Sequence, residues 1–229
     1  MTPVERSGRP PLGYIPETRG VTMNWAVPFY DRMCRALGLG QAFRRRTMAA
    51  AGLRPDQAVL DVGCGTGVLT RLAAEAVGRA GRAVGIDPTP GMIRTALEEA
   101  RRLGSAAEFE PGVVEELRFE PESFDIVLAS MMLHHLPADL KRAGLREIRR
   151  VLKAGGRLVA VDLDRPAQPA WWVVIWPMLL VPSVSIQLRG ELDAYLREAG
   201  FDPVERVGHW RGLLTFWTAV KPGRASSGS

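Results

Sequence analysis

The fold of this chain is decided by the stretch Ala58-Val59-Leu60-Asp61-Val62-Gly63-Cys64-Gly65-Thr66-Gly67. Its first half is a short apolar run of the kind that forms a buried β-strand. Its second half has glycine at alternate positions, which lets the backbone bend sharply and lets a ligand approach main-chain N–H groups. Residues 68–72 then open a helix, whose N-terminus is suited to anionic or carboxylate groups. The stretch therefore predicts a strand, a ligand-binding turn and a helix.

A second acidic residue extends this pattern. Val84-Gly85-Ile86-Asp87 is typical of the end of the next strand, and Asp87 lies 20 residues after Gly67. In a βαβ unit this spacing places a carboxylate beside the ribose of a bound nucleoside. Asp61 is suited to accept a hydrogen bond from a ligand ammonium or to order the turn. The glycine pattern is G-x-G-x-G rather than the G-x-G-x-x-G of dinucleotide enzymes, so a dehydrogenase is disfavoured but stays open.

Strand-like and helix-like runs alternate along the rest of the chain, which indicates a parallel sheet with helices on both faces. A helical cap is expected over 22–51, broken at Pro28. Two further strand-like runs close the chain as a hairpin. We predict an α/β fold with a doubly wound, seven-stranded, mostly parallel sheet and an antiparallel C-terminal hairpin. Its expected strands are 58–63, 82–87, 106–110, 124–130, 156–163, 202–209 and 213–220, and its expected helices are 67–77, 89–103, 139–153 and 190–199.

These motifs together resemble the class I S-adenosylmethionine-dependent methyltransferases. The glycine turn is similar to their first motif, and Gly85-Ile86-Asp87 is similar to their ribose-binding acidic motif. Three later segments follow in the order typical of the family, namely 123–127, 133–136 and 147–156. The resemblance covers residues 25 to 220. Within the superfamily it is closest to the ubiquinone/menaquinone-biosynthesis type and its small-molecule and phospholipid methyltransferase relatives.

The resemblance implies S-adenosylmethionine as the cofactor, with the glycines against its methionyl part, Asp87 against the ribose and Met92 near the adenine. The residues that it places at the cofactor are Tyr30, Asp61, Gly63, Cys64, Gly65, Gly67, Asp87, Pro88, Met92, Val113, Val114, Ser130 and His135. Val113 stands where related enzymes carry an aspartate for the adenine amine, so adenine recognition falls to backbone groups or to Glu115. No Cys/His cluster has metal-ligand spacing, and we predict no metal.

His134 and His135 are candidate general bases, because imidazole titrates near neutral pH. They follow the fourth predicted strand, at the edge where ligands bind in open α/β sheets. The Leu-His-His-Leu run recurs in related enzymes with different acceptors, so a structural or cofactor-closing role stays open for both. Tyr30 is a further catalytic candidate from the cap, which in related enzymes covers the cofactor and forms one wall of the substrate pocket. The alternative is that Tyr30 is a packed aromatic.

The segment from Pro166 to Leu188 contains no charged residue and is rich in tryptophan. Its length approaches a membrane span. Pro177 and Pro182 interrupt any helix there, and a span at this point would break the sheet. Two interpretations remain open. The segment is a buried cap, or it is an apolar lid that shapes a lipophilic pocket or contacts a bilayer surface through 171–186.

Composition fits one globular domain over 21–222, with a flexible lead at 1–20 and a tail at 223–229. The net charge of +5 is compatible with nucleic acid, with an anionic membrane or with a coding bias toward arginine. No basic stripe is interleaved with aromatic residues, which argues against nucleic acid. Cys34 and Cys64 make no disulfide framework, and no secretory pattern opens the chain. We expect a cytoplasmic protein, membrane-peripheral if 171–186 contacts a bilayer.

The sequence therefore predicts methyl transfer from S-adenosylmethionine to a lipophilic small molecule or lipid. The acceptor would be a quinone precursor, a natural-product hydroxyl or carbon, or a phospholipid amine. Two alternatives stay open, a non-catalytic cofactor-binding protein of the same fold and an RNA methyltransferase.

Overall fold

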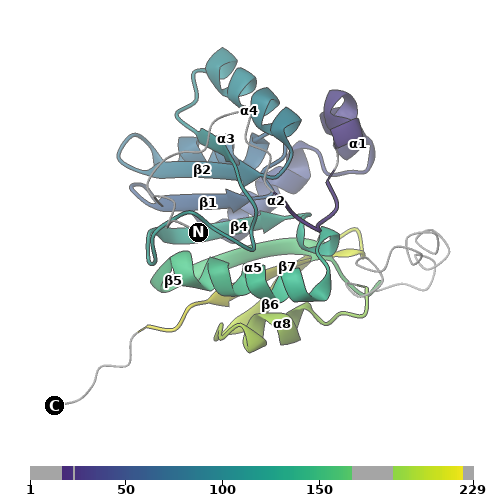
Figure 1. The fold of residues 1–229 in the computed structure, drawn as a ribbon, viewed down its shortest axis with the longest axis vertical. Coiled ribbons are helices and arrows are strands. Elements are labelled where there is room, and N and C mark those ends of the chain that lie inside the picture. Colours follow the sequence, from purple (N-terminus) through teal and green to yellow (C-terminus); the bar gives the residue numbers. More distant parts are fainter. Residues whose placement is uncertain (1–16, 23, 167–187, 224–229) are drawn as a thin grey trace.

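A computed structural model of the chain describes residues 17–22, 24–166 and 188–223. Figure 1 shows its helices and strands around one central sheet. In chain order they are η1 (Asn24–Phe29), α1 (Tyr30–Ala36), α2 (Gln41–Ala51), β1 (Ala58–Val62), α3 (Val68–Val77), β2 (Arg82–Asp87), α4 (Pro90–Leu103), β3 (Glu108–Pro111), β4 (Phe124–Ser130), η2 (Leu133–His135), α5 (Ala138–Val151), β5 (Leu152–Leu163), α8 (Leu192–Glu198), β6 (Val204–Trp210) and β7 (Leu214–Val220).

The seven strands lie in the order β3-β2-β1-β4-β5-β7-β6. β1 pairs in parallel with β2 and β4, β2 with β3, and β4 with β5. β7 is antiparallel to both β5 and β6. The predicted mostly parallel sheet with an antiparallel C-terminal hairpin is confirmed. Because the carboxyl ends of parallel strands meet at one edge, the turns after β1, β2 and β4 come together there.

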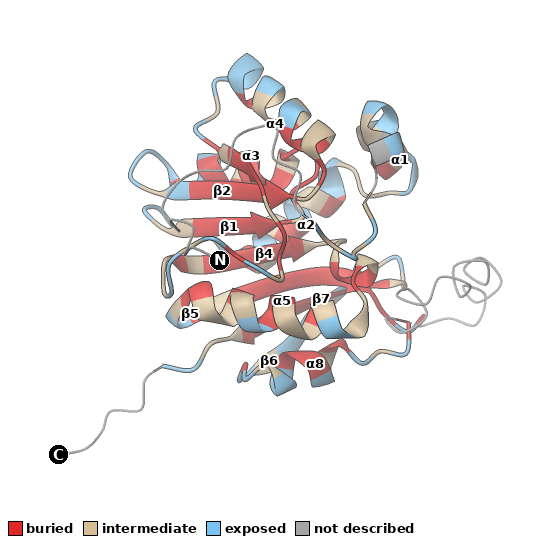
Figure 2. Ribbon diagram, in the orientation of Figure 1, coloured by how far each residue is buried: buried red, intermediate tan, exposed pale blue. Residues whose placement is uncertain are grey.

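Both faces of the sheet are covered by helices, because successive side chains of a strand point to opposite faces. Leu60 and Val62 of β1 share a core cluster with residues of α5 and α8. Val59, which directly precedes Leu60, packs instead in a cluster with residues of α2, α3 and α4. Figure 1 shows α5 and α8 together on the near face, and Figure 2 shows the central strands buried along most of their length.

The observed elements differ from the predicted ones in two places. The predicted cap helix is divided into η1, α1 and α2, and the division between α1 and α2 includes Gly38, whose φ of +79° ends a helix readily. β5 begins at Leu152, directly after α5, rather than at 156. The pairing register of β5 against β4 shifts between Phe124 and Ile126. A bulge-like irregularity therefore separates the first residues of β5 from its regular pairing with β4.

The apolar segment and its predicted bilayer contact at 171–186 fall almost entirely on residues 167–187, which lie outside the described residues. In the described ranges, none of the helices has the length and apolar character that crossing a membrane requires.

The third glycine of the turn is required by packing as well as by backbone conformation. Gly67 caps the N-terminus of α3 with a φ of +73°. A Cβ there would lie 2.4 Å from Cε1 of Phe109 and 2.9 Å from Cβ of Ala96. Gly104 caps the C-terminus of α4 with a φ of +63°, and a Cβ there meets nothing within 4 Å in the described part of the chain. The two positions share a left-handed backbone and differ in the space around it.

We therefore predict that Gly67→Ala destabilises the protein more than Gly104→Ala. The left-handed backbone alone costs roughly 1–2 kcal/mol for alanine. Overpacking against Phe109 and Ala96 adds about 1–3 kcal/mol at Gly67. The free energy of unfolding from urea titration measures the difference, and equal losses in the two variants would show that Phe109 moves aside without cost.

Candidate active site

Two neighbouring cavities flank the glycine turn at the carboxyl edge of the sheet. The larger has a volume of about 680 Å³ and the smaller about 470 Å³, and both are open to solvent. Both are lined by Tyr30, Gly63 and Met131, so they meet at the turn. The site is therefore an elongated depression that runs across the turn on both sides.

The larger cavity combines an apolar lining with carboxylates at its sides. It is bounded by the segment before η1, by the ends of β2 and β3, and by the turn after β4. Its lining residues are Thr18, Gly20, Val21, Thr22, Tyr30, Gly63, Gly65, Ile86, Asp87, Pro88, Thr89, Met92, Gly112, Val113, Val114, Glu115, Met131, Met132, His135 and Leu136.

Asp87 ties the end of β2 to the glycine turn. Its Oδ2 accepts the Gly65 N–H at 3.0 Å, and its Oδ1 accepts the Thr89 N–H at 2.8 Å. Burial raises the pKa of this carboxyl, while the hydrogen bonds from Thr89 and Gly65 oppose the rise. Each carboxylate oxygen can accept a further hydrogen bond, and Asp87 lines the larger cavity. A ribose, which offers two adjacent hydroxyl donors, fits this position.

Asp61 is the buried acid of the smaller cavity. Its Oδ2 accepts the hydroxyl of Thr70 at 2.7 Å. Burial, together with the nearby charge of Asp87, raises the pKa of Asp61 to about 7 against the opposing hydrogen bonds from Thr70. A carboxyl in this state gains from a cationic partner, and an ammonium group in the smaller cavity would supply one.

Arg44 supplies the opposite charge in the same cavity. Its guanidinium donates to Oδ1 of Asp31 at 2.9 Å, and the same oxygen accepts the hydroxyl of Thr66 at 3.1 Å. An acid and a guanidinium that line one cavity are complementary to the ammonium and carboxylate of an amino-acid group. The methionyl end of S-adenosylmethionine carries that pair of charges, so the residues of the smaller cavity fit it.

Tyr30 packs directly over the glycine turn. A Cβ at Gly65 would lie 3.2 Å from Cε1 of the Tyr30 ring, so only glycine leaves room for this approach. Burial, followed by the proximity of Cys34 and Asp87, raises the pKa of the phenol above its ordinary value. The Tyr30 hydroxyl is therefore protonated at neutral pH, which suits a covering and hydrogen-bonding role rather than that of a base.

The two adjacent histidines have different surroundings. His134 is buried, and its Nδ1 lies 2.6 Å from Oδ1 of Asp162. Oδ2 of Asp162 also accepts the N–H groups of Leu133 and His134, at 2.8 and 3.2 Å. Burial raises the pKa of Asp162, but the His134 ring, the Leu163 N–H and the nearby charge of Lys141 outweigh it, and the pKa lies below its ordinary value. This cluster holds the η2 turn against β5, and His134 lines neither of the two cavities.

His135 is the histidine that reaches the larger cavity. Burial, together with the neighbouring His134, lowers its pKa to about 4, with Asp162 opposing. The imidazole of His135 is therefore neutral at physiological pH and accepts hydrogen bonds. A pKa this low makes His135 a weaker base than an ordinary imidazole, and proton transfer by either histidine stays a prediction.

The structure brings most of the predicted cofactor residues to the cavities, as the larger cavity's lining shows. Asp61, Cys64 and Ser130 line the smaller cavity. Gly67 lines neither and serves the packing of α3. His209 lies on β6, where its Nδ1 is 2.9 Å from the hydroxyl of Thr215. Within the described ranges, His, Cys, Asp and Glu side chains form no group of three that could hold a metal ion.

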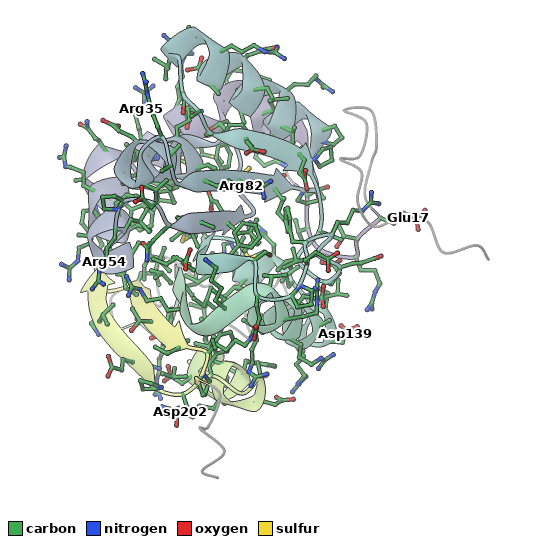
Figure 3. All side chains as sticks on the ribbon, turned by 90° about the vertical axis from the view of Figure 1, so that its left-hand side faces the viewer. Glu17, Arg35, Arg54, Arg82, Asp139 and Asp202 are labelled. Atoms are coloured by element: carbon green, nitrogen blue, oxygen red, sulfur yellow. The ribbon has the colours of Figure 1, made fainter. Side chains whose placement is uncertain are left out.

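Several cavity residues escaped the sequence analysis. Thr18 and Gly20 were assigned to the flexible lead, yet the Thr18 hydroxyl donates to Glu115 at 2.5 Å and both residues line the larger cavity. The Val21 N–H donates to the His135 carbonyl at 3.0 Å, and Arg19 pairs with Asp139 of α5. Figure 3 shows Glu17 and Asp139 on the same side of the molecule. These contacts are long-range, so no local pattern reports them.

Other missed residues carried a usable signal. Met131 and Met132 directly follow β4, and the rule that ligands bind at the carboxyl edge would have found them. Arg44 lies in a run of three consecutive arginines, and such a run gives no indication of which arginine turns inward.

Comparisons with known proteins agree with this geometry. The sequence profile of the family described as "Methyltransferase domain" matches residues 59–156. The ubiquinone/menaquinone biosynthesis C-methyltransferase UbiE of Ectopseudomonas mendocina is 35% identical over 218 residues, which cover 84% of each chain. The 2-phytyl-1,4-naphtoquinone methyltransferase of Synechococcus elongatus is 33% identical over 147 residues. That alignment covers 62% of this chain and spans 62% of the length of the cyanobacterial relative.

Solved structures share the fold. The crystal structure of a SAM-dependent methyltransferase from Aquifex aeolicus has a TM-score of 0.70 against this chain at 21% sequence identity. The similarity covers 87% of this chain and 99% of the Aquifex chain.

The elevated pKa of Asp61 gives a pH prediction for the site. If ionised Asp61 holds the cofactor ammonium, affinity for S-adenosylhomocysteine rises as pH rises toward and through about 7, where the buried carboxyl loses its proton. Below that pKa the affinity falls by up to about tenfold per pH unit. Isothermal titration with S-adenosylhomocysteine at a series of pH values measures this dependence of affinity on pH. Asp61→Asn should bind weakly with little pH dependence, and a wild-type profile retained in that variant would contradict the assignment.

Proposed function

Because the chain belongs to the class I S-adenosylmethionine-dependent methyltransferases, of the ubiquinone/menaquinone-biosynthesis type, we propose that it methylates a lipophilic quinone precursor. The observation that carries the proposal is the pair of cavities that meet at Gly63, one with the charges for an amino-acid group and the other with Asp87 and an apolar wall. The names of the relatives support a quinone-type acceptor at about one-third identity.

The cofactor supplies a methyl group on a sulfonium, which is an activated leaving group. The task of this chain is then to bind, orient and exclude water. We infer that Asp61 and Arg44, which line the smaller cavity, would bind the two charges of the amino-acid end, and that Asp87, which lines the larger cavity, would bind the ribose. The ring of Tyr30 covers the glycine turn at Gly65.

The wall of the larger cavity is suited to an apolar acceptor. Val21, Met131, Met132 and Leu136 line it on the side of η2. Methionine side chains are flexible and polarizable, so they adapt to a flat ring with an irregular tail. His135, among these residues, offers a neutral imidazole to the hydroxyl of a reduced quinone. We infer that His135 orients this hydroxyl and so aligns the ring with the methyl group.

We predict that the protein binds S-adenosylhomocysteine and that Asp87→Asn weakens the binding by roughly 10- to 100-fold, the value of one or two hydrogen bonds to a charged group. Isothermal titration measures the change. Glu98→Gln, which removes an exposed carboxylate on α4, is the matched control and should bind like the wild type.

The same preparation is then incubated with methyl-labelled S-adenosylmethionine and a reduced, demethylated naphthoquinone that carries an isoprenoid tail. We expect label in the organic phase. Tight binding without transfer to the quinol would instead favour a non-catalytic cofactor-binding protein, and transfer to added tRNA would favour an RNA methyltransferase.

The lowered pKa of His135 leads to a separate prediction. Its neutral form is already complete above about pH 5, because the pKa lies near 4. At saturating cofactor, kcat should therefore show no fall as pH decreases from 8 to about 5.5, where an ordinary histidine would become protonated. His135→Gln should lower kcat by about 10²-fold or more if the imidazole orients the hydroxyl. His209→Gln on β6 is the matched control, and an equal loss in both would refute a specific role.

A further inference from the structure

Exposed apolar side chains are concentrated on the cap. Among the described residues six large apolar side chains are markedly exposed, and four of them lie between Val21 and Leu37. Trp25, Phe29 and Leu37 are 74%, 61% and 62% exposed. Large aromatic and aliphatic groups on one short segment form a patch of the kind that marks an interaction surface, whereas single exposed residues do not.

The inner side of the same segment is well packed. Val27 lies against the N-terminus of α4, where a Cβ at Gly91 would be 3.1 Å from its Cγ2. Tyr30 lies over Gly65, and Cys34 is buried. The cap is therefore held to the body of the protein by one side. Phe29 lies three residues before Arg32, a spacing that keeps both exposed residues on the outward side of α1.

The outward side also carries positive charge. Residues 21–51 contain five arginines against one aspartate, hence a net charge of +4. That aspartate, Asp31, is already paired with Arg44. Arg32 and Arg35 are exposed, and Figure 3 shows Arg35 at the margin of the molecule. An apolar patch flanked by arginines is complementary to a surface that is anionic outside and hydrocarbon beneath.

The patch borders the mouth of the larger cavity. Val21 lines that cavity and is itself 51% exposed. In Figure 1 the parallel strands point toward the side of the molecule on which α1 lies. A partner surface that bound Trp25 and Phe29 would therefore lie next to the entrance of the larger cavity.

We propose that Trp25, Phe29, Arg32, Arg35 and Leu37 form a docking face for an anionic lipid bilayer. The aromatic rings and Leu37 enter the headgroup boundary, and the two arginines contact lipid phosphates. A lipophilic acceptor then passes from the bilayer to the larger cavity without crossing water. This last step rests on the proposed function, whereas the binding of the bilayer does not.

The test is co-sedimentation of the purified full chain with vesicles of phosphatidylcholine, with and without phosphatidylglycerol. We expect binding to the anionic vesicles that weakens with added salt. Arg32→Gln with Arg35→Gln should lower the partition coefficient about 25-fold, at roughly fivefold per arginine. Trp25→Ala with Phe29→Ala should lower it on the order of tenfold or more.

Matched controls remove the same groups elsewhere. Arg146→Gln with Arg197→Gln removes two exposed arginines from α5 and α8, and Leu103→Ala removes an exposed leucine from α4. Both should bind vesicles within about twofold of the wild type, because screened charges far from the face contribute little. Equal losses in the face variants and the controls would overturn the proposal. Unchanged vesicle binding in the face variants would also overturn the proposal, whether or not these variants lose affinity for tRNA.

The two proposals fail separately. Vesicle binding is measured without cofactor or acceptor, so intact binding with no methyl transfer contradicts the proposed function alone. The face residues line neither cavity, and their variants should methylate a detergent-dispersed quinol at the wild-type rate. Transfer to the dispersed quinol together with failure of the wild type to bind anionic vesicles contradicts the docking face alone.

Discussion

The burial of three carboxylates at one edge of the sheet is the constraint on which the site depends. Asp87 is the last residue of β2, and Asp61 and Asp162 are the penultimate residues of β1 and β5; their exposed fractions are 8%, 1% and 0%. A buried carboxylate is tolerated only when hydrogen bonds or opposite charges replace its water. Asp87 and Asp162 therefore fix the turns that supply their donors, whereas Asp61 is bound to Thr70 of α3. Residues of the glycine turn and of η2 line the cavities.

Hydrogen bonds and opposite charges replace the lost water to different extents for the three carboxylates. This difference separates the structural carboxylate from the two that face a ligand. Asp162 receives donors from two backbone N–H groups of η2 and faces the ring of His134, and its pKa lies below the ordinary value. Asp61 and Asp87 receive fewer donors, and their pKa values are raised. Only these two line the cavities. The carboxylates that the chain leaves under-compensated are thus those that a ligand's ammonium and hydroxyl groups could reach.

The sequence predicts the parts of this arrangement that local patterns encode. The bounds of β2 and β4 match their predicted ranges, and the glycine turn and Asp87 lie where the βαβ spacing placed them. The different environments of His134 and His135 are not encoded locally, because they depend on Asp162, 28 residues away from His134. The same holds for Thr18, which reaches the site only through its contact with Glu115. Tertiary partners determine what adjacent, chemically identical residues can do.

Asp61 also couples the stability of the fold to the site. Its pKa in the folded protein is raised from 3.8 to about 7, so the folded state holds a proton that the unfolded state releases between these values. Stability contributed by this group therefore falls as pH rises from about 4 to about 7, by an amount on the order of 4 kcal/mol. Above pH 7 the empty site holds an ionised, poorly compensated acid. A ligand ammonium beside Asp61 would return part of that free energy, because binding to the folded state alone stabilises it. The same residue thus weakens the empty protein and strengthens its complex, as a group retained for binding rather than for folding would do.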